Sequence, residues 1–330
     1  MPVADPQTYL ANITGIVKKK WPDHRRVNIV CHGHSVPGGY FATPDVRTFD
    51  SYPFLLHVAL SQRFPFSVIN VVVTAIGREE SETGGQRFEG EVLVHRPDVL
   101  TIDYGLNDRR IGLERAKVAW KSMIERAKAR GIKVLCMTPS TDVTQRPGVP
   151  PDQSEPLKQH AAQIRALAAE YGVGLVDSLA AFEAYQRGGG ELWNLLSVSN
   201  HPNRAGHDMI VRELVKWFPD PDFQMGAALQ RIMAYAAGRR IGTPAGDPTL
   251  VGGVVMQKFT GGPETEGECA VTDSSRGTWL VRNDFYRNWK LTDHGGPTED
   301  EHGEDNGAGQ LFDRVRMTWR PGVGTKIFPR

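Results

Sequence analysis

Five short apolar runs restrict the fold of this chain more than any other feature of its sequence. The runs are VNIVC (27–31), SVINVVVTA (67–75), DVLTIDY (98–104), KVLCMTP (133–139) and GVGLVD (172–177). They are rich in Val, Ile and Leu and lack polar alternation, which is typical of strands buried on both faces of a parallel sheet. Stretches of helical character alternate with them, at residues 50–64, 111–131, 155–172 and 203–218. This order predicts an α/β fold with right-handed crossovers, a three-layer α/β/α sandwich around a five-stranded parallel sheet.

Ligands of such sheets bind beyond the carboxyl ends of the strands. The segments that directly follow the apolar runs are therefore the first places to search for functional residues. They are residues 32–39, 74–78, 105–109 and 138–142, together with Asp177.

The composition changes after Pro219, and we expect two domains, 1–222 and 223–330. The second begins with a helical stretch at 223–238 and continues as a small, turn-rich β module that contains the short apolar runs VVMQKF, TWLVRN and VRMTW. Five of its aromatic residues can supply a core: Trp279, Phe285, Trp289, Phe312 and Trp319. Stretches 241–262 and 295–322 share an order of Gly and Pro, polar loop, strand and Gly turn, which raises the hypothesis of a two-copy repeat.

Charge and cysteine content exclude several classes of protein. The 39 basic and 38 acidic residues leave a net charge of +1, so no overall field would recruit nucleic acid. The three cysteines are too far apart for a disulfide framework or a zinc site. No run is long enough to span a membrane, and the N-terminus lacks a signal-peptide pattern. We expect a cytoplasmic protein, or a secreted one if a signal precedes this sequence.

The stretch CHGHSVPGGY (31–40) places Ser35 directly after the first predicted strand. A serine in such a place is commonly a cap or turn former, whereas a nucleophile also needs a base, oxyanion donors and a group that orients the base. Gly77 and Asn107 follow the second and third strands, where a backbone N–H and a side-chain amide can donate beside the N–H of Ser35. His201 stands on a loop before the last helix and is the candidate base.

These residues occur as four ordered blocks: Gly33-x-Ser35, Gly77, Gly105-x-Asn107-Asp108 and His201-Pro202-Asn203. The set resembles the SGNH, or GDSL-type, hydrolase superfamily of esterases and lipases over residues 26–217. The resemblance implies a flavodoxin-like sandwich with Ser35 as nucleophile and His201 as general base. It also implies an oxyanion hole made by the N–H groups of Ser35 and Gly77 and the side chain of Asn107.

One departure from the family concerns the group that orients His201. The family usually has aspartate three residues before this histidine, and here the position is Val198. We expect a backbone carbonyl of Ser197 or Val198 to orient His201, which would give a Ser-His dyad. Asp177, at the end of the fifth strand, is the leading carboxylate alternative, although it also suits a helix cap. Weaker options are the side chains of Ser199 and Asn200.

The second departure is His34, which stands directly before Ser35 where the family usually has aspartate. His34 is a candidate for substrate contact or for setting the loop. His32 and His34 alternate on an extended segment and have no further ligands spaced near them, so we expect hydrogen-bonded histidines and no metal site.

The favoured function is serine ester hydrolysis through an acyl-enzyme, on small-acyl esters that include carbohydrate acetyl esters, with no cofactor. The alternatives are an acyltransferase or thioesterase that uses the same residues, and a catalytically weak carbohydrate-binding protein. The C-terminal stretches are similar to LGFP-type repeats, which accompany some bacterial esterases and are associated with cell-envelope polysaccharide. That resemblance implies a glycan-binding module and export, and the alternative is a lid or dimerisation module. The expected partner is a small-molecule or glycan ester.

Overall fold

The chain divides into two compact units, Met1–Pro219 and Asp220–Arg330. The computed structural model describes residues 2–143, 154–251, 253–263, 267–274, 277–304 and 306–329. No helix in these described ranges has the length and apolar character needed to cross a bilayer.

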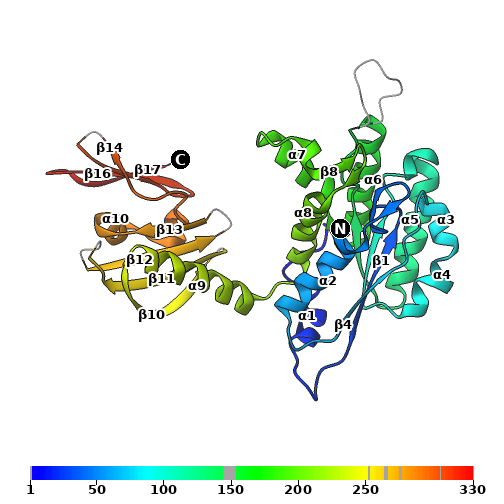
Figure 1. Cartoon of the computed structure of the whole chain (residues 1–330), viewed down its shortest axis with the longest axis horizontal. Coiled ribbons are helices and arrows are strands. Elements are labelled where there is room, and N and C mark those ends of the chain that lie inside the picture. Colours follow the sequence, from blue (N-terminus) through cyan, green and yellow to red (C-terminus); the bar gives the residue numbers. More distant parts are fainter. Residues whose placement is uncertain are drawn as a thin grey trace. The chain divides into compact units, whose positions relative to one another are not determined.

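The first unit is built on a five-stranded sheet, which confirms the predicted α/β fold (Figure 1). Its order is β4 (Ile69–Val73), β1 (Val27–Gly33), β5 (Val99–Asp103), β6 (Lys133–Met137) and β7 (Gly174–Val176). Every neighbouring pair is parallel. Each strand coincides with one of the five apolar runs, because a strand covered by helices on both faces has no reason to alternate polar and apolar residues.

Helices cover both faces of this sheet and give it two separate cores. They are α1 (Ala11–Val17), α2 (Tyr52–Arg63), α3 (Ser81–Gln86), α4 (Phe88–Glu91), α5 (Leu113–Lys128), α6 (Ser154–Tyr171), α7 (Ser178–Arg187) and α8 (Arg204–Leu214). One core joins α2 and α8 to the sheet through buried residues such as Leu56 and Leu214. The other joins α5 and α6 through residues such as Trp120 and Leu167. This is the three-layer arrangement predicted from the order of the elements.

Two short hairpins stand near the carboxyl ends of the strands. They are β2 (Tyr40–Ala42) with β3 (Asp45–Val46), and β8 (Leu196–Val198) with β9 (His201–Pro202). The hydroxyl of Ser197 donates to the carbonyl of Phe41 and so links the two hairpins.

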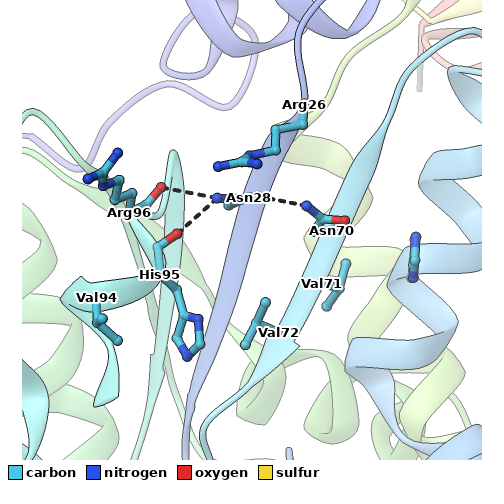
Figure 2. Close-up of a pocket in the computed structure, with 9 residues that line it drawn as sticks. Arg26, Asn28, Asn70, Val71, Val72, Val94, His95 and Arg96 are labelled. Carbon is cyan, nitrogen blue, oxygen red and sulfur yellow. Dashed lines mark hydrogen bonds between the residues drawn. The ribbon is translucent and has the colours of Figure 1, made fainter. Parts of the chain in front are cut away.

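A cavity of about 610 Å³ lies at the amino ends of the strands, opposite their carboxyl ends (Figure 2). Arg26 and Asn28, at the amino end of β1, line it together with Asn70 and Arg96. The Asn70 amide donates to the Asn28 side chain at 2.9 Å. Because Ser35 follows the other end of β1, this cavity is separate from the residues that the sequence picks out.

The second unit contains α9 (Pro221–Gly238) and two four-stranded antiparallel sheets. The first sheet consists of β10 (Gly242–Val251), β11 (Val254–Gly261), β12 (Glu268–Ser274) and β13 (Gly277–Val281). After α10 (Asn283–Asn288) and α11 (Leu291–His294), the second consists of β14 (His302–Glu304), β15 (Gly307–Leu311), β16 (Val315–Arg320) and β17 (Gly324–Pro329).

The two sheets share a local pattern. In each, a buried glutamine on the second strand, Gln257 or Gln310, is followed two residues later by a fully buried phenylalanine, Phe259 or Phe312. Both glutamine amides donate to backbone carbonyls, at 3.1 Å to Gly246 and at 3.0 Å to Glu299. This pattern supports the two-copy repeat, although residues 252 and 305 of the compared stretches lie outside the described residues. The likeness to LGFP-type repeats stays a prediction.

Gly33 sets how closely β1 and β5 approach at the carboxyl end of the sheet. A Cβ at this position would lie 2.4 Å from the backbone oxygen of Asp103 and 2.8 Å from the ring of Pro37. We expect Gly33→Ala to lower the free energy of unfolding by about 1–3 kcal/mol, measured by urea denaturation, because the backbone must shift. As the matched control, Gly15→Ala in α1 meets nothing within 4 Å and should leave stability equal or higher. Equal stability of the two variants would contradict this account of Gly33.

Candidate active site

Ser35 lies on a closed turn that directly follows β1. The turn is held by backbone hydrogen bonds from Gly38 to the His34 carbonyl (3.2 Å) and from Tyr40 to the Ser35 carbonyl (3.0 Å). Gly39 takes a φ of +82°, which favours glycine over residues with a Cβ. The turn leaves Ser35 7% exposed, close beneath the surface at the carboxyl end of the sheet.

His201 contacts this serine directly. Its Nε2 lies 2.8 Å from Ser35 Oγ, although the two residues are 166 positions apart in the sequence. The side chain of Asn203 accepts from the N–H of Gly206 at 3.1 Å and caps α8, which fixes where the loop ends. The N–H of Val143 donates to the Ser199 carbonyl at 2.8 Å and holds the loop to the segment after β6. The structure therefore brings together the serine and the histidine that the sequence singled out.

The other ring nitrogen of His201 has no partner among the described residues. Nδ1 is buried and without a hydrogen bond. It carries the ring proton when Nε2 accepts from the Ser35 hydroxyl. The expected bond to a carbonyl of Ser197 or Val198 is absent, because Val198 lies directly opposite His201 in the β8–β9 hairpin and its backbone runs beside the backbone of His201. The Ser197 hydroxyl donates instead to the His201 carbonyl at 3.0 Å, so it contacts the backbone and not the ring.

Asp177 does not orient His201 either, and the alternative that assigned it this role is wrong. Its carboxylate pairs with the guanidinium of Arg165 at 2.7 Å. It also accepts from the N–H of Ala180 and from the hydroxyl of Thr138, so it caps α7. These partners hold the Asp177 carboxylate at the start of α7, which explains why it does not orient His201.

Burial dominates the electrostatics of His201. It lowers the pKa of His201 to about 4, the neighbouring His34 imidazole acts in the same direction, and the carboxylate of Asp142 opposes both. Asp142 is itself paired with Arg109 at 2.7 Å. His201 is therefore neutral at neutral pH, the state in which Nε2 can accept a proton.

Gly77 and Asn107 approach the serine from the two strands that flank β1. The N–H of Ile76 donates to the Gly33 carbonyl at 3.1 Å, which places Gly77 beside the Ser35 turn. A Cβ on Gly77 would lie 2.8 Å from the ring of Tyr40, so the chain passes there only as glycine. The amide of Asn107 donates one N–H to the Glu79 carbonyl at 2.9 Å, and its second N–H is a further donor.

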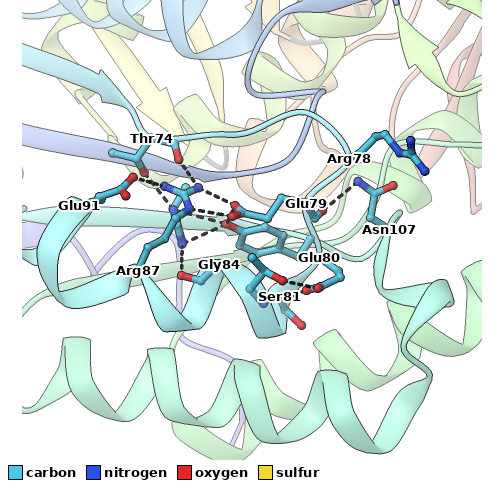
Figure 3. A network of polar contacts seen from close by, with 12 residues as sticks. Thr74, Arg78, Glu79, Glu80, Ser81, Gly84, Arg87, Glu91 and Asn107 are labelled. Carbon is cyan, nitrogen blue, oxygen red and sulfur yellow. Dashed lines mark hydrogen bonds and ion pairs between the residues drawn. The ribbon is translucent and has the colours of Figure 1, made fainter.

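A buried network of polar contacts holds the segment around Gly77 (Figure 3). The sequence contains no motif that predicts this network. The carboxylate of Glu79 accepts from Arg87 Nε at 2.7 Å and from the Tyr104 hydroxyl at 2.8 Å. Arg87 also donates to the Thr74 carbonyl. Because Glu79 and Thr74 stand on either side of Gly77, the network fixes both ends of the segment.

His32 belongs to the same network. It lies 2.9 Å from the Thr74 hydroxyl and 3.0 Å from the Tyr104 hydroxyl. Burial, and then the charge of Arg87, lower the pKa of His32 to about 3. His32 is thus neutral, and it is hydrogen-bonded as the sequence predicted. No group of metal-ligating side chains is found among the described residues.

His34 is fully buried, at 0% exposed, so it presents no surface to a substrate in this structure, and substrate contact stays a prediction. Its Nδ1 accepts from the N–H of Val36 at 3.2 Å and lies 3.4 Å from Ser35 Oγ. Its Nε2 lies 3.4 Å from a carboxylate oxygen of Asp103. The other role expected for it, setting the loop, agrees with these contacts.

The depressed pKa of His201 is open to direct measurement. In an NMR titration of the imidazole signals, assigned with the His201→Ala variant, we expect a midpoint near 4, with the ring protonated below that pH and neutral above it. Burial is the reason, because the charged form loses solvation. A midpoint near the ordinary value of about 6.5 would show that the ring is hydrated or paired with a carboxylate.

Comparisons with solved structures find similar folds. Acetylxylan esterase Axe2 from Geobacillus stearothermophilus is 20% identical, with a TM-score of 0.51 over 59% of this chain and 94% of the other. A two-domain esterase (CEX) active on acetylated mannans is 16% identical, with a TM-score of 0.51 over 64% of this chain and 52% of the other. At these identities the likeness shows the fold. No curated protein matches the chain.

A family model described as GDSL-like lipase/acylhydrolase matches residues 31–209, more than half of the chain. The match begins within β1 and spans the Ser35 turn, Gly77, Asn107 and His201. The chain belongs to the GDSL-like lipase/acylhydrolase family and is a carboxylic ester hydrolase.

Proposed function

We propose that this chain hydrolyses small-acyl esters of carbohydrates, with Ser35 as nucleophile and His201 as general base. The observation that carries the proposal is the 2.8 Å contact between His201 Nε2 and Ser35 Oγ. A nucleophilic serine requires a base at this distance, and a neutral imidazole supplies one. The contact also argues against a catalytically weak binding protein, in which nothing would maintain this geometry.

In the first half of the reaction, Ser35 Oγ attacks the ester carbonyl while its proton moves to His201 Nε2. The carbonyl oxygen becomes negatively charged, and three donors serve it: the N–H groups of Ser35 and Gly77 and the side chain of Asn107. The C–O bond to the alcohol then breaks, and His201 returns the proton to the departing alcohol oxygen. An acyl group remains on Ser35.

In the second half, water attacks the acyl-enzyme and gives its proton to His201. The same donors hold the second oxyanion, and the C–O bond to Ser35 breaks as His201 returns the proton to Ser35 Oγ. The acid leaves, and the site returns to its starting state. A partner at Nδ1 is not required for either proton transfer, because both use Nε2.

The carbohydrate part of the proposal is supported by two features. The similar folds include an acetylxylan esterase and an esterase active on acetylated mannans. In addition, the β2–β3 hairpin brings the half-buried ring of Tyr40 to the border of the site, where it lies against Gly77. Aromatic side chains at a site border offer flat apolar faces of the kind that stack on sugar rings.

The substrate class can be tested with acetylated xylan and p-nitrophenyl acetate. We expect the wild type to release acetate from both, and the Ser35→Ala variant to release acetate from neither above the background rate. Removal of the nucleophile of such a site costs about six decades in kcat. Release of acetate by Ser35→Ala at a rate close to wild type would contradict the proposal.

Asn107 is tested separately. We expect Asn107→Ala to lower kcat by about two to three decades with little change in KM, because an oxyanion donor acts in the transition state. Asn70→Ala, at the opposite edge of the sheet, is the matched control and should behave as wild type. A change of less than about threefold for Asn107→Ala would remove it from the oxyanion hole.

A further inference from the structure

A second imidazole lies against the nucleophile. Ser35 Oγ lies between His201 Nε2 at 2.8 Å and His34 Nδ1 at 3.4 Å. Neither His201 Nδ1 nor His34 Nε2 makes a hydrogen bond in the described structure, but the Asp103 carboxylate lies 3.4 Å from His34 Nε2. Asp103 and His34 thus form a carboxylate–histidine pair that adjoins the nucleophile Ser35, and this pair does not include the base His201.

The backbone fixes the proton on His34. The N–H of Val36 can only donate, and it points at His34 Nδ1 from 3.2 Å, so Nδ1 holds a lone pair. The ring proton of neutral His34 therefore sits on Nε2, which lies 3.4 Å from Asp103 Oδ1 and makes no hydrogen bond in the described structure. A separation of 3.4 Å is long for a hydrogen bond, so the attraction is that of a partial positive N–H toward a carboxylate in a site with little solvent.

The sheet holds Asp103 in this place. Asp103 is the last residue of β5, pairs with Gly33 across β1, and accepts from the N–H of His34 at 3.3 Å through its backbone oxygen. Its side chain lies close against Gly33, where a Cβ would come within 3.1 Å of the Cβ of Asp103. Asp103 is 4% exposed and His34 is 0% exposed, so the pair lies beneath the serine turn and presents almost no surface to a substrate.

The proton position on His34 determines what Ser35 can do. With Nε2 protonated, Nδ1 of His34 is occupied by the Val36 N–H and holds the turn closed. In the other tautomer, Nδ1 would carry a proton directed at the Val36 N–H and at Ser35 Oγ. The Nδ1–H of His34 and the N–H of Val36 would then point at each other, and their repulsion would open the turn. A carboxylate at Nε2 favours the first tautomer, as carboxylates do for histidines in triads and metal sites.

We propose that Asp103 and His34 are positioning residues for the nucleophile: Asp103 holds His34 in the tautomer that accepts the Val36 N–H, and this holds Ser35 toward His201. The proposal rests on the assignment of Ser35 as the nucleophile. Among the described residues no acid is hydrogen-bonded to His201, and the proposal accounts for the order of such a site because the order is imposed on the serine.

The test asks whether the effect of Asp103→Asn on kcat depends on the presence of His34. An asparagine side chain accepts the N–H two residues ahead in an Asx turn, so His34→Asn keeps the bond to Val36 without needing Asp103. His34→Leu loses it. We expect His34→Leu to lower kcat by about tenfold or more at little change in KM, and His34→Asn to recover most of that loss. Asp103→Asn should lower kcat by about tenfold when His34 is present and by less than about twofold in the His34→Asn background.

Equal effects of Asp103→Asn in the two backgrounds would overturn the proposal, because a merely structural role of Asp103 does not depend on a histidine at 34. If variants fail to fold, ¹⁵N shifts of His34 in the wild type decide the matter, since protonated Nδ1 would contradict it. Failure of the proposed function is distinguishable, because the wild type would then show neither ester turnover nor phosphonylation of Ser35 by a fluorophosphonate.

Discussion

The hydrogen bond between Ser35 and His201 is the interaction on which the proposed chemistry of the first unit depends. Its two ends lie 166 residues apart, so the fold must deliver each one separately. The end of β1 and the Ser35 turn deliver the serine, while the β8–β9 hairpin and the cap on α8 deliver the histidine. Because parallel strands present all their carboxyl ends on one side of the sheet, Gly77 and Asn107 come to the same side as Ser35.

The unusual feature of the site is the environment of the base. In the part of the chain that the structure describes, the buried Nδ1–H of His201 has no partner, which costs on the order of 1–3 kcal/mol. Burial also disfavours the charged form that His201 passes through. The Asp142 carboxylate offsets part of this, but its charge is shared with Arg109. In the proposed reaction, catalysis therefore depends on geometry and oxyanion donors more than on a strong base. The buried network of Glu79, Arg87 and Tyr104, which fixes the segment of Gly77, is consistent with that emphasis.

The sequence predicted those parts of the structure that local composition determines. All five strands of the parallel sheet and the pairing of Ser35 with His201 could be foreseen, because buried strands are uniformly apolar and functional residues gather at strand ends. The role of Asp177 could not, since a helix cap and an orienting acid occupy the same place in a strand-loop-helix sequence, and the choice is made by Arg165 twelve residues earlier. Strand β10 was also missed, because GTPAGDPTLV has the composition of a loop and is stabilised by pairing with β11.

The partners of His34 could not be predicted either, since Asp103 is brought beneath it by the register of β1 with β5.

The proposed chemistry requires that His201 activates Ser35. The most direct measurement is the rate and location of fluorophosphonate labelling, followed by mass spectrometry of peptides from the wild type and the His201→Ala variant. We expect a single label on Ser35, which forms several decades more slowly in the His201→Ala variant. Rapid labelling of Ser35 in His201→Ala, or a label on another residue, would contradict it.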